Sequence, residues 1–160
     1  MSEQAAYERV CASVLGAELD ADECRVVAGV MGVRHLGDGE VLVSEGEEDT
    51  ALYLLAEGKL GVISEIDGQN VQVYTMSEGE CAGTRAFVDR SPRKATLKAV
   101  GNATVYVLQP AAFESLLDTH PRIVYRVMRA LFRITHMNLM RMNLESQQLS
   151  NYITKSHGRY

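Results

Sequence analysis

The sequence has no tryptophan and little cysteine, proline or histidine, and these scarcities narrow the possible functions. The three cysteines, Cys11, Cys24 and Cys81, form no Cys-x-x-Cys pair, so neither a disulfide framework nor a zinc site is indicated and reduced thiols are expected. The four histidines are scattered, which argues against a metal-dependent enzyme. The acidic loop at 45–49 is expected to be solvated, and no nucleophile motif stands out, so we expect neither a metal site nor catalysis.

Positive charge is also scarce. The 16 Lys and Arg residues are outnumbered by 21 Asp and Glu residues, and the net charge of −5 argues against DNA binding. No apolar run is long enough to cross a bilayer, and residues 1–12 contain no signal-like stretch. We therefore expect a cytoplasmic protein with no membrane partner. With 46% hydrophobic residues, the 160-residue chain is expected to form one domain, 1–160.

The order of the patterns predicts two helices, a run of short strands and a long helix. Apolar spacing predicts helices over 4–15 and, after an acidic cap at Asp20, to about Val30. Runs rich in branched residues predict strands at 31–36, 40–44, 51–57, 59–66, 70–76, 95–100 and 103–109. Asp67-Gly68 favours a type I′ hairpin turn. Short strands at this spacing are typical of an antiparallel barrel or jelly roll, an α+β fold that is mainly β.

After Pro110 the pattern changes to helical spacing. A short helix is predicted at 111–117, and Pro121 is expected to begin a longer helix that ends near Gln148. Its apolar side is too broad for one small barrel, so part of it is expected to pair with a second copy. Four arginines follow another side, and we expect them to pair with carboxylates rather than with DNA. They are Arg122, Arg126, Arg129 and Arg133.

The stretch 79–96 interrupts the run of strands. A small-residue turn at Ala82-Gly83 leads into a short apolar helical turn and then into a Pro-Arg step at 92–93. Small residues let the backbone approach a ligand, and the amides that open a helical turn are unpaired. Arg93 supplies a two-pronged positive charge. This pattern predicts a phosphate site.

The same stretch resembles the phosphate-binding cassette of cyclic nucleotide-binding domains, such as those of the catabolite activator protein and the protein kinase A regulatory subunits. That cassette reads roughly Phe-Gly-Glu-Leu-Ala-Leu and, after a few residues, Pro-Arg-Ala-Ala-Thr. Its glycine and arginine are ten positions apart, as are Gly83 and Arg93. On this register Ala86 matches the family's alanine. The family's ribose-binding glutamate falls at Thr84, and the leucine after it falls at Arg85.

The resemblance covers about 15–142 and implies a cupin-like double-stranded β-helix at about 31–109 with a long helix at 121–148. It implies a regulatory ligand, not a cofactor, with the cyclic phosphate on Arg93 and on the amides from Gly83 to Ala86. Lys94 stands where a Ser or Thr would favour cGMP, so cAMP is preferred. In the family a residue about forty-five positions after the arginine closes over the base, which indicates Asn138. The alternative role of Asn138, which the sequence favours equally, is to set the register of a dimer interface.

Two functions follow. In the first, a cytoplasmic sensor that is a homodimer through its C-terminal helix transmits cAMP binding to a protein partner by shifting an equilibrium. Residues 149–160 are too few for the winged helix-turn-helix of the transcription factors in this family, so output through dimerisation or a partner is expected. In the second, Thr84 and Arg85 mark a degenerate, ligand-free fold that acts as a dimeric protein-interaction module.

Overall fold

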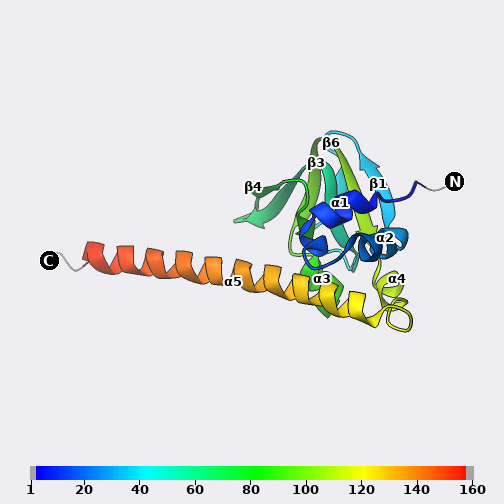
Figure 1. Ribbon diagram of the computed structural model, residues 1–160. Helices are drawn as coiled ribbons and strands as arrows, with labels where there is room; N and C mark the ends of the chain where they lie inside the picture. The colour runs from blue at the N-terminus through cyan, green and yellow to red at the C-terminus, as the bar shows by residue number, and fades with distance from the viewer. Residues whose placement is uncertain (1–2, 158–160) are drawn as a thin grey trace.

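A curled antiparallel sheet forms the centre of the molecule, whose computed structural model describes residues 3–157. Figure 1 shows the sheet curling into a barrel, with short helices against it and one long helix running away from it. The strands are β1 (Gly32–Leu36), β2 (Val41–Val43), β3 (Leu52–Ile66), β4 (Gln69–Met76), β5 (Cys81–Ala82) and β6 (Thr96–Leu108). They follow the order β1-β6-β3-β4, with β2 on β6 and β5 on β3. The predicted fold class is confirmed; the ends of the predicted domain, 1–2 and 158–160, lie outside the described residues.

Two long strands replace four of the predicted short ones. The joined pairs are 51–57 with 59–66 in β3, and 95–100 with 103–109 in β6. The glycines between them, Gly58 and Gly101, have φ values of 88° and 73° and lie where the pairing of β3 with β6 shifts register. A Cβ at Gly58 would lie 2.3 Å from the carbonyl oxygen of Asn102. These glycines therefore bend the strands where they approach closely instead of ending them.

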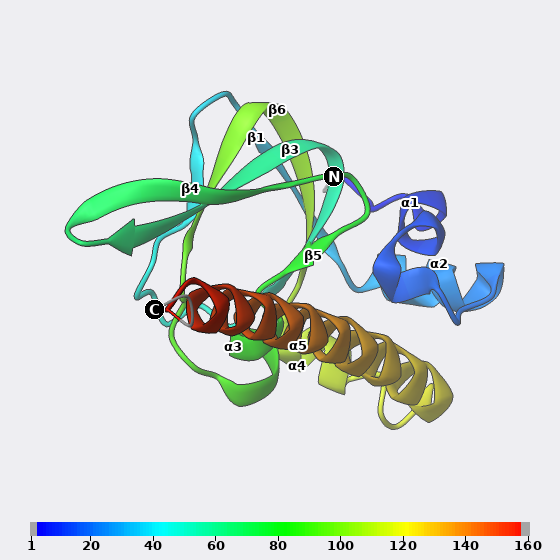
Figure 2. The ribbon, with the colours of Figure 1, turned by 90° about the vertical axis from the view of Figure 1, so that its left-hand side faces the viewer.

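The turn between β3 and β4 confirms the predicted hairpin. Asp67 and Gly68 both have positive φ, 52° and 77°, as a type I′ turn requires. β5 was not predicted, because two residues are too few to show a strand period. It leads through Gly83 into the short helix α3 (Thr84–Asp89), which lies on the same side of the barrel as the long helix α5 (Figure 2).

The N-terminal helical region is confirmed with one break. α1 (Tyr7–Ala12) and the 3-10 turn η1 (Val14–Gly16) replace the predicted single helix, because the side chain of Ser13 accepts a hydrogen bond from the amide of Leu15. α2 (Ala21–Gly29) begins as expected at Asp20, which forms a capping box with Glu23.

A disulfide joins α1 to α2, so the expectation of reduced thiols was wrong for two cysteines. Cys11 and Cys24 are bonded, with their Cα atoms 5.7 Å apart. Their separation of 13 residues matched no motif, and the packing of the two helices brings them together. Cys81 is a free thiol.

The last two helices are α4 (Pro110–Glu114) and α5 (Pro121–His157). α5 has 37 residues and continues beyond the predicted end at Gln148. Because α5 is so long, helical residues outnumber strand residues although the barrel forms the centre. Its length is about 55 Å at the rise of an α-helix. It is the last element among the described residues.

Ion pairs attach the first half of α5 to α2 and to the turn before it. Arg126 pairs with Glu23, while Arg129 and Arg133 lie 3.4 and 2.8 Å from the same oxygen of Glu18. Three of the four arginines of the predicted stripe are thus paired with carboxylates, as expected.

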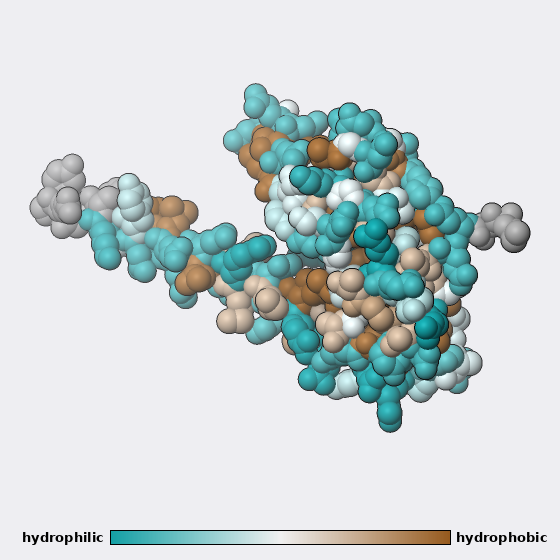
Figure 3. Space-filling model, turned by 45° about the horizontal axis from the view of Figure 1, so that its top comes forward, coloured by the Kyte–Doolittle hydropathy of each residue, from teal (hydrophilic) through white to brown (hydrophobic). Residues whose placement is uncertain are grey.

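Two hydrophobic clusters form the core of the barrel and join it to the helices. One fills the barrel and includes Leu36, Leu55, Leu60, Leu97 and Val105. The other lies between the barrel and the helices and includes Val10, Leu15, Val27, Phe113, Ile123, Val127 and Leu131. Beyond Leu131 the apolar side chains of α5 are mostly exposed, and brown patches mark the projecting helix in Figure 3. Only the part of α5 up to about Ile134 therefore packs against this hydrophobic cluster.

Candidate functional site

A cavity of about 460 Å³ lies between the barrel, α3 and the middle of α5. This volume falls within the range of about 300–1,000 Å³ that is usual for small-molecule sites. The residues predicted from the sequence line this one cavity: Gly83, Thr84, Arg85, Ala86, Arg93, Lys94 and Asn138. Strands contribute an apolar wall of Val62, Met76 and Leu97. A single space thus combines a polar end from α3 and Arg93 with an apolar interior.

Gly83 shapes the polar end of the cavity. It adopts a left-handed conformation with φ 86° and caps α3. A Cβ there would lie 1.9 Å from Nη1 of Arg93 and 3.0 Å from the carbonyl oxygen of Ala51, so no larger residue fits without a shift. The first hydrogen bond of α3 runs from the Phe87 amide to the Gly83 carbonyl at 2.9 Å. The amides of residues 84–86 therefore have no acceptor inside the helix.

Arg93 is a buried charge whose bonding is incomplete. Its residue exposure is 6%, and Nη2 donates a hydrogen bond to the carbonyl oxygen of Ala51. Nη2 also lies 3.3 Å from Oδ2 of Asp49, and the guanidinium stacks 5.0 Å from the ring centre of Tyr53. Nε and Nη1 are buried without a hydrogen-bond partner. Because a buried donor without an acceptor is costly, these two groups favour an anion in the cavity.

Asp49 and Tyr53 hold the other side of Arg93. Burial by itself raises the pKa of Asp49, but hydrogen bonds from Tyr53 and from the Ala51 amide, together with the charge of Arg93, lower that pKa below its ordinary value. Burial and the bond to Asp49 raise the pKa of Tyr53, so its hydroxyl remains a donor. The expectation of a solvated 45–49 loop was wrong for Asp49, whose side chain is only 27% exposed.

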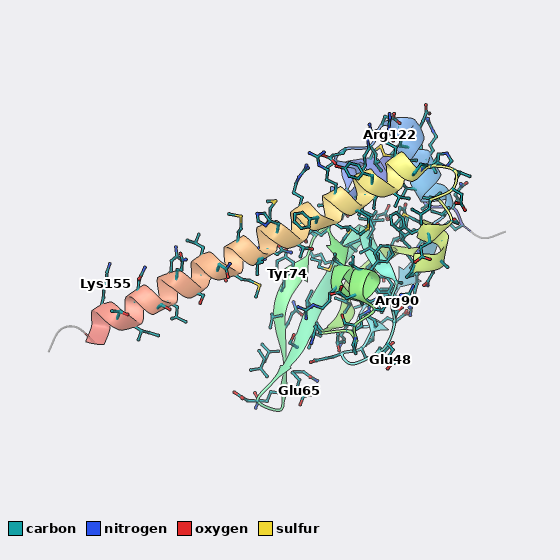
Figure 4. All side chains as sticks on the ribbon, turned by 90° about the horizontal axis from the view of Figure 1, so that it is seen from below. Glu48, Glu65, Tyr74, Arg90, Arg122 and Lys155 are labelled. Atoms are coloured by element: carbon teal, nitrogen blue, oxygen red, sulfur yellow. A yellow bond between two sulfur atoms is a disulfide. The ribbon has the colours of Figure 1, made fainter. Side chains whose placement is uncertain are left out.

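The opposite side of the cavity is built by β4 and α5. Tyr74, which Figure 4 labels where β4 approaches α5, donates a hydrogen bond to Glu80. Asn138 and Arg141 line the cavity from one face of α5, because they are three positions apart on the helix. The bond to Glu80 raises the pKa of Tyr74, whereas the charge of Arg141 acts to lower it. Polar groups therefore lie at both ends of the cavity.

Some contributors to the site were missed in the sequence. Arg141 could have been found, since it lies on the helix face of Asn138. Asp49 and Tyr53 carry no local signal, because they lie four positions apart, just before and within β3, and folding brings them against Arg93. Tyr74 comes from β4, which folding brings to the cavity.

Other chemistries have little support in the part of the chain that is described. Among the described side chains, residues 3–155, no three His, Cys, Asp or Glu side chains are grouped so as to hold a metal ion. In the same range no helix is both long and apolar enough to cross a membrane. Desolvation raises the pKa of the Cys81 thiol, which lines the cavity and is thus a poor nucleophile.

Comparison with curated proteins identifies partial relatives. Lysophospholipase nte1 of Aspergillus oryzae is 31% identical over 94 residues, which is 58% of this chain and 6% of that protein. A candidate potassium channel protein of Rhodopseudomonas palustris is 30% identical over 137 residues, which is 84% of this chain and 32% of that protein. The chain therefore spans about a third of the length of one relative and under a tenth of the other.

Solved structures share the fold. A cyclic nucleotide-binding domain from Methylobacillus flagellatus has a TM-score of 0.81 at 19% identity and covers 88% of this chain and 84% of that one. The catabolite activator protein of Thermus thermophilus has a TM-score of 0.77 at 24% identity, covering 86% and 63%. The regulatory domain of Toxoplasma gondii PKA with cAMP has a TM-score of 0.69 at 21% identity, covering 82% and 48%. The sequence profile of the cyclic nucleotide-binding domain matches residues 33–120, more than half of the sequence, and the chain belongs to this family.

Proposed function

We propose that this regulatory domain binds a cyclic nucleotide in the cavity beside Arg93. The cyclic phosphate accepts hydrogen bonds from Nε and Nη1 of Arg93 and from the amides that begin α3. The base lies against the apolar wall of Val62 and Leu97, and Asn138 of α5 contacts its edge. Among the cyclic mononucleotides the preferred ligand is cAMP, because Lys94 offers no hydroxyl beside Arg93. The domain acts as a sensor and not as an enzyme.

The observation that carries this proposal is the state of Arg93. A guanidinium that is 6% exposed keeps two nitrogen groups without an acceptor, and it is held in place by Asp49, Ala51 and Tyr53. Leaving a buried donor unbonded costs about 1–3 kcal/mol. An anion that accepts from both groups recovers this cost, and the planar fork of arginine suits a phosphate.

Thermal unfolding with and without cAMP and cGMP tests the proposal. Ligand at about one hundred times its dissociation constant stabilises a protein by about 2.7 kcal/mol, which corresponds to a rise of about 5–10 °C for a domain of this size. Arg93→Ala is expected to abolish the rise. Arg90→Ala is the matched control, because Arg90 is an exposed neighbour that pairs with Glu114 instead of lining the cavity. An equal rise in wild type and Arg93→Ala would refute the phosphate role.

The signal is proposed to leave through α5. Ile134, Asn138 and Arg141 line the cavity from this helix, so a ligand that contacts them biases its position. A second face of α5 carries exposed apolar residues at heptad spacing: Tyr125, Phe132, Leu139, Met142 and Leu149. This spacing is that of the a and d positions of a coiled coil, and a parallel homodimer is the proposed assembly.

Sedimentation equilibrium tests the dimer. Leu139→Glu places a charge within the heptad seam and is expected to shift the protein toward monomer. Met140→Glu is the matched control, because Met140 is similarly exposed but lies off the seam. Equal effects of the two variants would contradict the proposed seam.

A second candidate function rests on the same exposed face. Phe132 is 73% exposed, and the seam continues well beyond the barrel, so it offers a large apolar surface to a protein partner. In this alternative the domain has lost its ligand and acts as a dimeric interaction module. It predicts no thermal response to any nucleotide and no functional effect of Arg93→Ala, while Leu139→Glu still disrupts assembly.

A further inference from the structure

The cavity carries more positive charge than one cyclic phosphate requires. Arg93, Arg85, Lys94 and Arg141 line it, and Glu80 is the one carboxylate among the described residues that do so. Glu80 is already engaged, because it accepts hydrogen bonds from the Tyr74 hydroxyl and from the Ser77 amide. Asp49 offsets Arg93 from outside the cavity. A ligand with a single negative charge therefore leaves the remaining cations uncompensated.

Most arginines elsewhere in the described chain lie beside a carboxylate, whereas two of the cavity's arginines do not. Of the eleven described arginines, eight lie within 4.0 Å of a carboxylate. The three that do not are Arg85, Arg122 and Arg141, and two of these line the cavity. Arg85 comes from the first turn of α3 and Arg141 from α5, so the charges approach the cavity from separate elements.

The interior groups and the outer cations divide the cavity by charge. Arg93 is buried and presents two orphaned donors, whereas Arg85, Lys94 and Arg141 are exposed. Thr84, the residue before Arg85 in the chain, lines the cavity with a neutral hydroxyl and no opposing charge. One anionic group can therefore bind at Arg93 while a second group of the same molecule remains near the exposed cations.

We propose that the preferred ligand is a nucleotide with a second phosphate charge, which Arg85 and Arg141 bind while Arg93 binds the first phosphate. This inference rests on the proposed function and specifies its ligand class. A cyclic dinucleotide supplies the second charge as a phosphodiester, and a linear nucleoside bisphosphate supplies it as a phosphomonoester. Both present the same chemistry to the two arginines, and titration distinguishes them.

Isothermal titration of the full chain with cAMP, cyclic di-AMP, cyclic di-GMP and adenosine 3′,5′-bisphosphate tests the proposal. At least one probe with two phosphate groups is expected to bind about tenfold more tightly than cAMP, because its second phosphate makes charge-assisted contacts with two exposed arginines. The double variant Arg85→Gln, Arg141→Gln is expected to lose this advantage, so that the ratio of the two affinities falls about tenfold. Arg122→Gln removes another arginine without a carboxylate partner, outside the cavity, and is expected to leave the ratio unchanged.

The outcomes separate this inference from the proposed function. If cAMP binds and no doubly phosphorylated probe binds more tightly, the second phosphate site is refuted and the proposed function stands. A tighter probe whose advantage survives in the double variant also refutes the role of the two arginines. If no nucleotide binds the wild-type chain, both proposals fail. Circular dichroism confirms that each variant is folded, and because the substituted side chains are exposed, the fold is expected to be retained.

Discussion

Replacement of Gly83 by alanine tests how tightly the cavity is built around Arg93. Gly83 has φ 86°, and its added Cβ would lie 1.9 Å from Nη1 of Arg93. Alanine in a left-handed conformation costs about 1–2 kcal/mol. The clash adds a second cost, because the guanidinium must move from Asp49 and Ala51, and a hydrogen bond to a charged group contributes about 1.5–3 kcal/mol. The free energy of unfolding is therefore expected to fall by about 2.5–5 kcal/mol in Gly83→Ala.

Gly68→Ala is the matched control. Gly68 also has positive φ, 77°, but a Cβ there would meet no atom within 4 Å. It lies in the β3–β4 turn and is expected to lose only the backbone cost of about 1–2 kcal/mol. Urea unfolding of both variants measures the difference, and titration with cAMP measures the loss of the proposed anion site. Equal destabilisation by the two substitutions, or full cAMP affinity in Gly83→Ala, would refute the argument that Gly83 is needed to seat Arg93.

Three further predictions concern bonds that hold the domain together. Because the pKa of Asp49 is lowered in the folded state, its contribution to stability is present above the ordinary value of 3.8 and is lost as the pH falls below it. Asp49→Asn is therefore expected to flatten the acid limb of a stability–pH profile. Reduction of the Cys11–Cys24 disulfide, which closes a loop of 13 residues, is expected to lower the free energy of unfolding by about 3 kcal/mol, and Cys24→Ser should make stability insensitive to dithiothreitol. Glu18→Ala removes two partly exposed ion pairs of α5 and should cost about 0.5–1 kcal/mol in urea unfolding, whereas Glu48→Ala on the exposed loop should have almost no effect.

Local patterns were sufficient to predict most of the succession of elements, but not the two-residue strand β5 or the break between α1 and η1. Helical spacing and the cap at Asp20 predicted α2, and the Asp67-Gly68 pair predicted the hairpin, because both signals depend on a few neighbouring residues. Local patterns were insufficient at Gly58 and Gly101. A glycine with positive φ can end a strand or bend it, and the outcome depends on pairing with a strand that lies far away in the sequence.

The candidate site likewise combines features that local patterns predict with features that only folding brings together. The spacing of ten positions from Gly83 to Arg93, and the small residues beside Gly83, were visible in the sequence because the proposed anion-binding turn is local. Folding supplied Asp49 and Tyr53 beside Arg93 and brought Arg141 to the far side of the cavity. Asp49 and Tyr53 have no fixed spacing from the turn, so no local pattern could identify them, whereas Arg141 could have been found from its place on the helix face of Asn138.

The Cys11–Cys24 bond and the burial of α5 side chains show the same distinction between local and long-range interactions. The amino-acid sequence alone determined that α5 is a helix with a broad apolar side, because helix formation depends on residues three and four positions apart. Only the tertiary structure decided that Ile123, Val127 and Leu131 are buried while Phe132 and Leu139 are exposed. Likewise, it decided that two cysteines on separate helices meet. Burial depends on which surfaces pack against each other, and that choice is made by the whole chain at once.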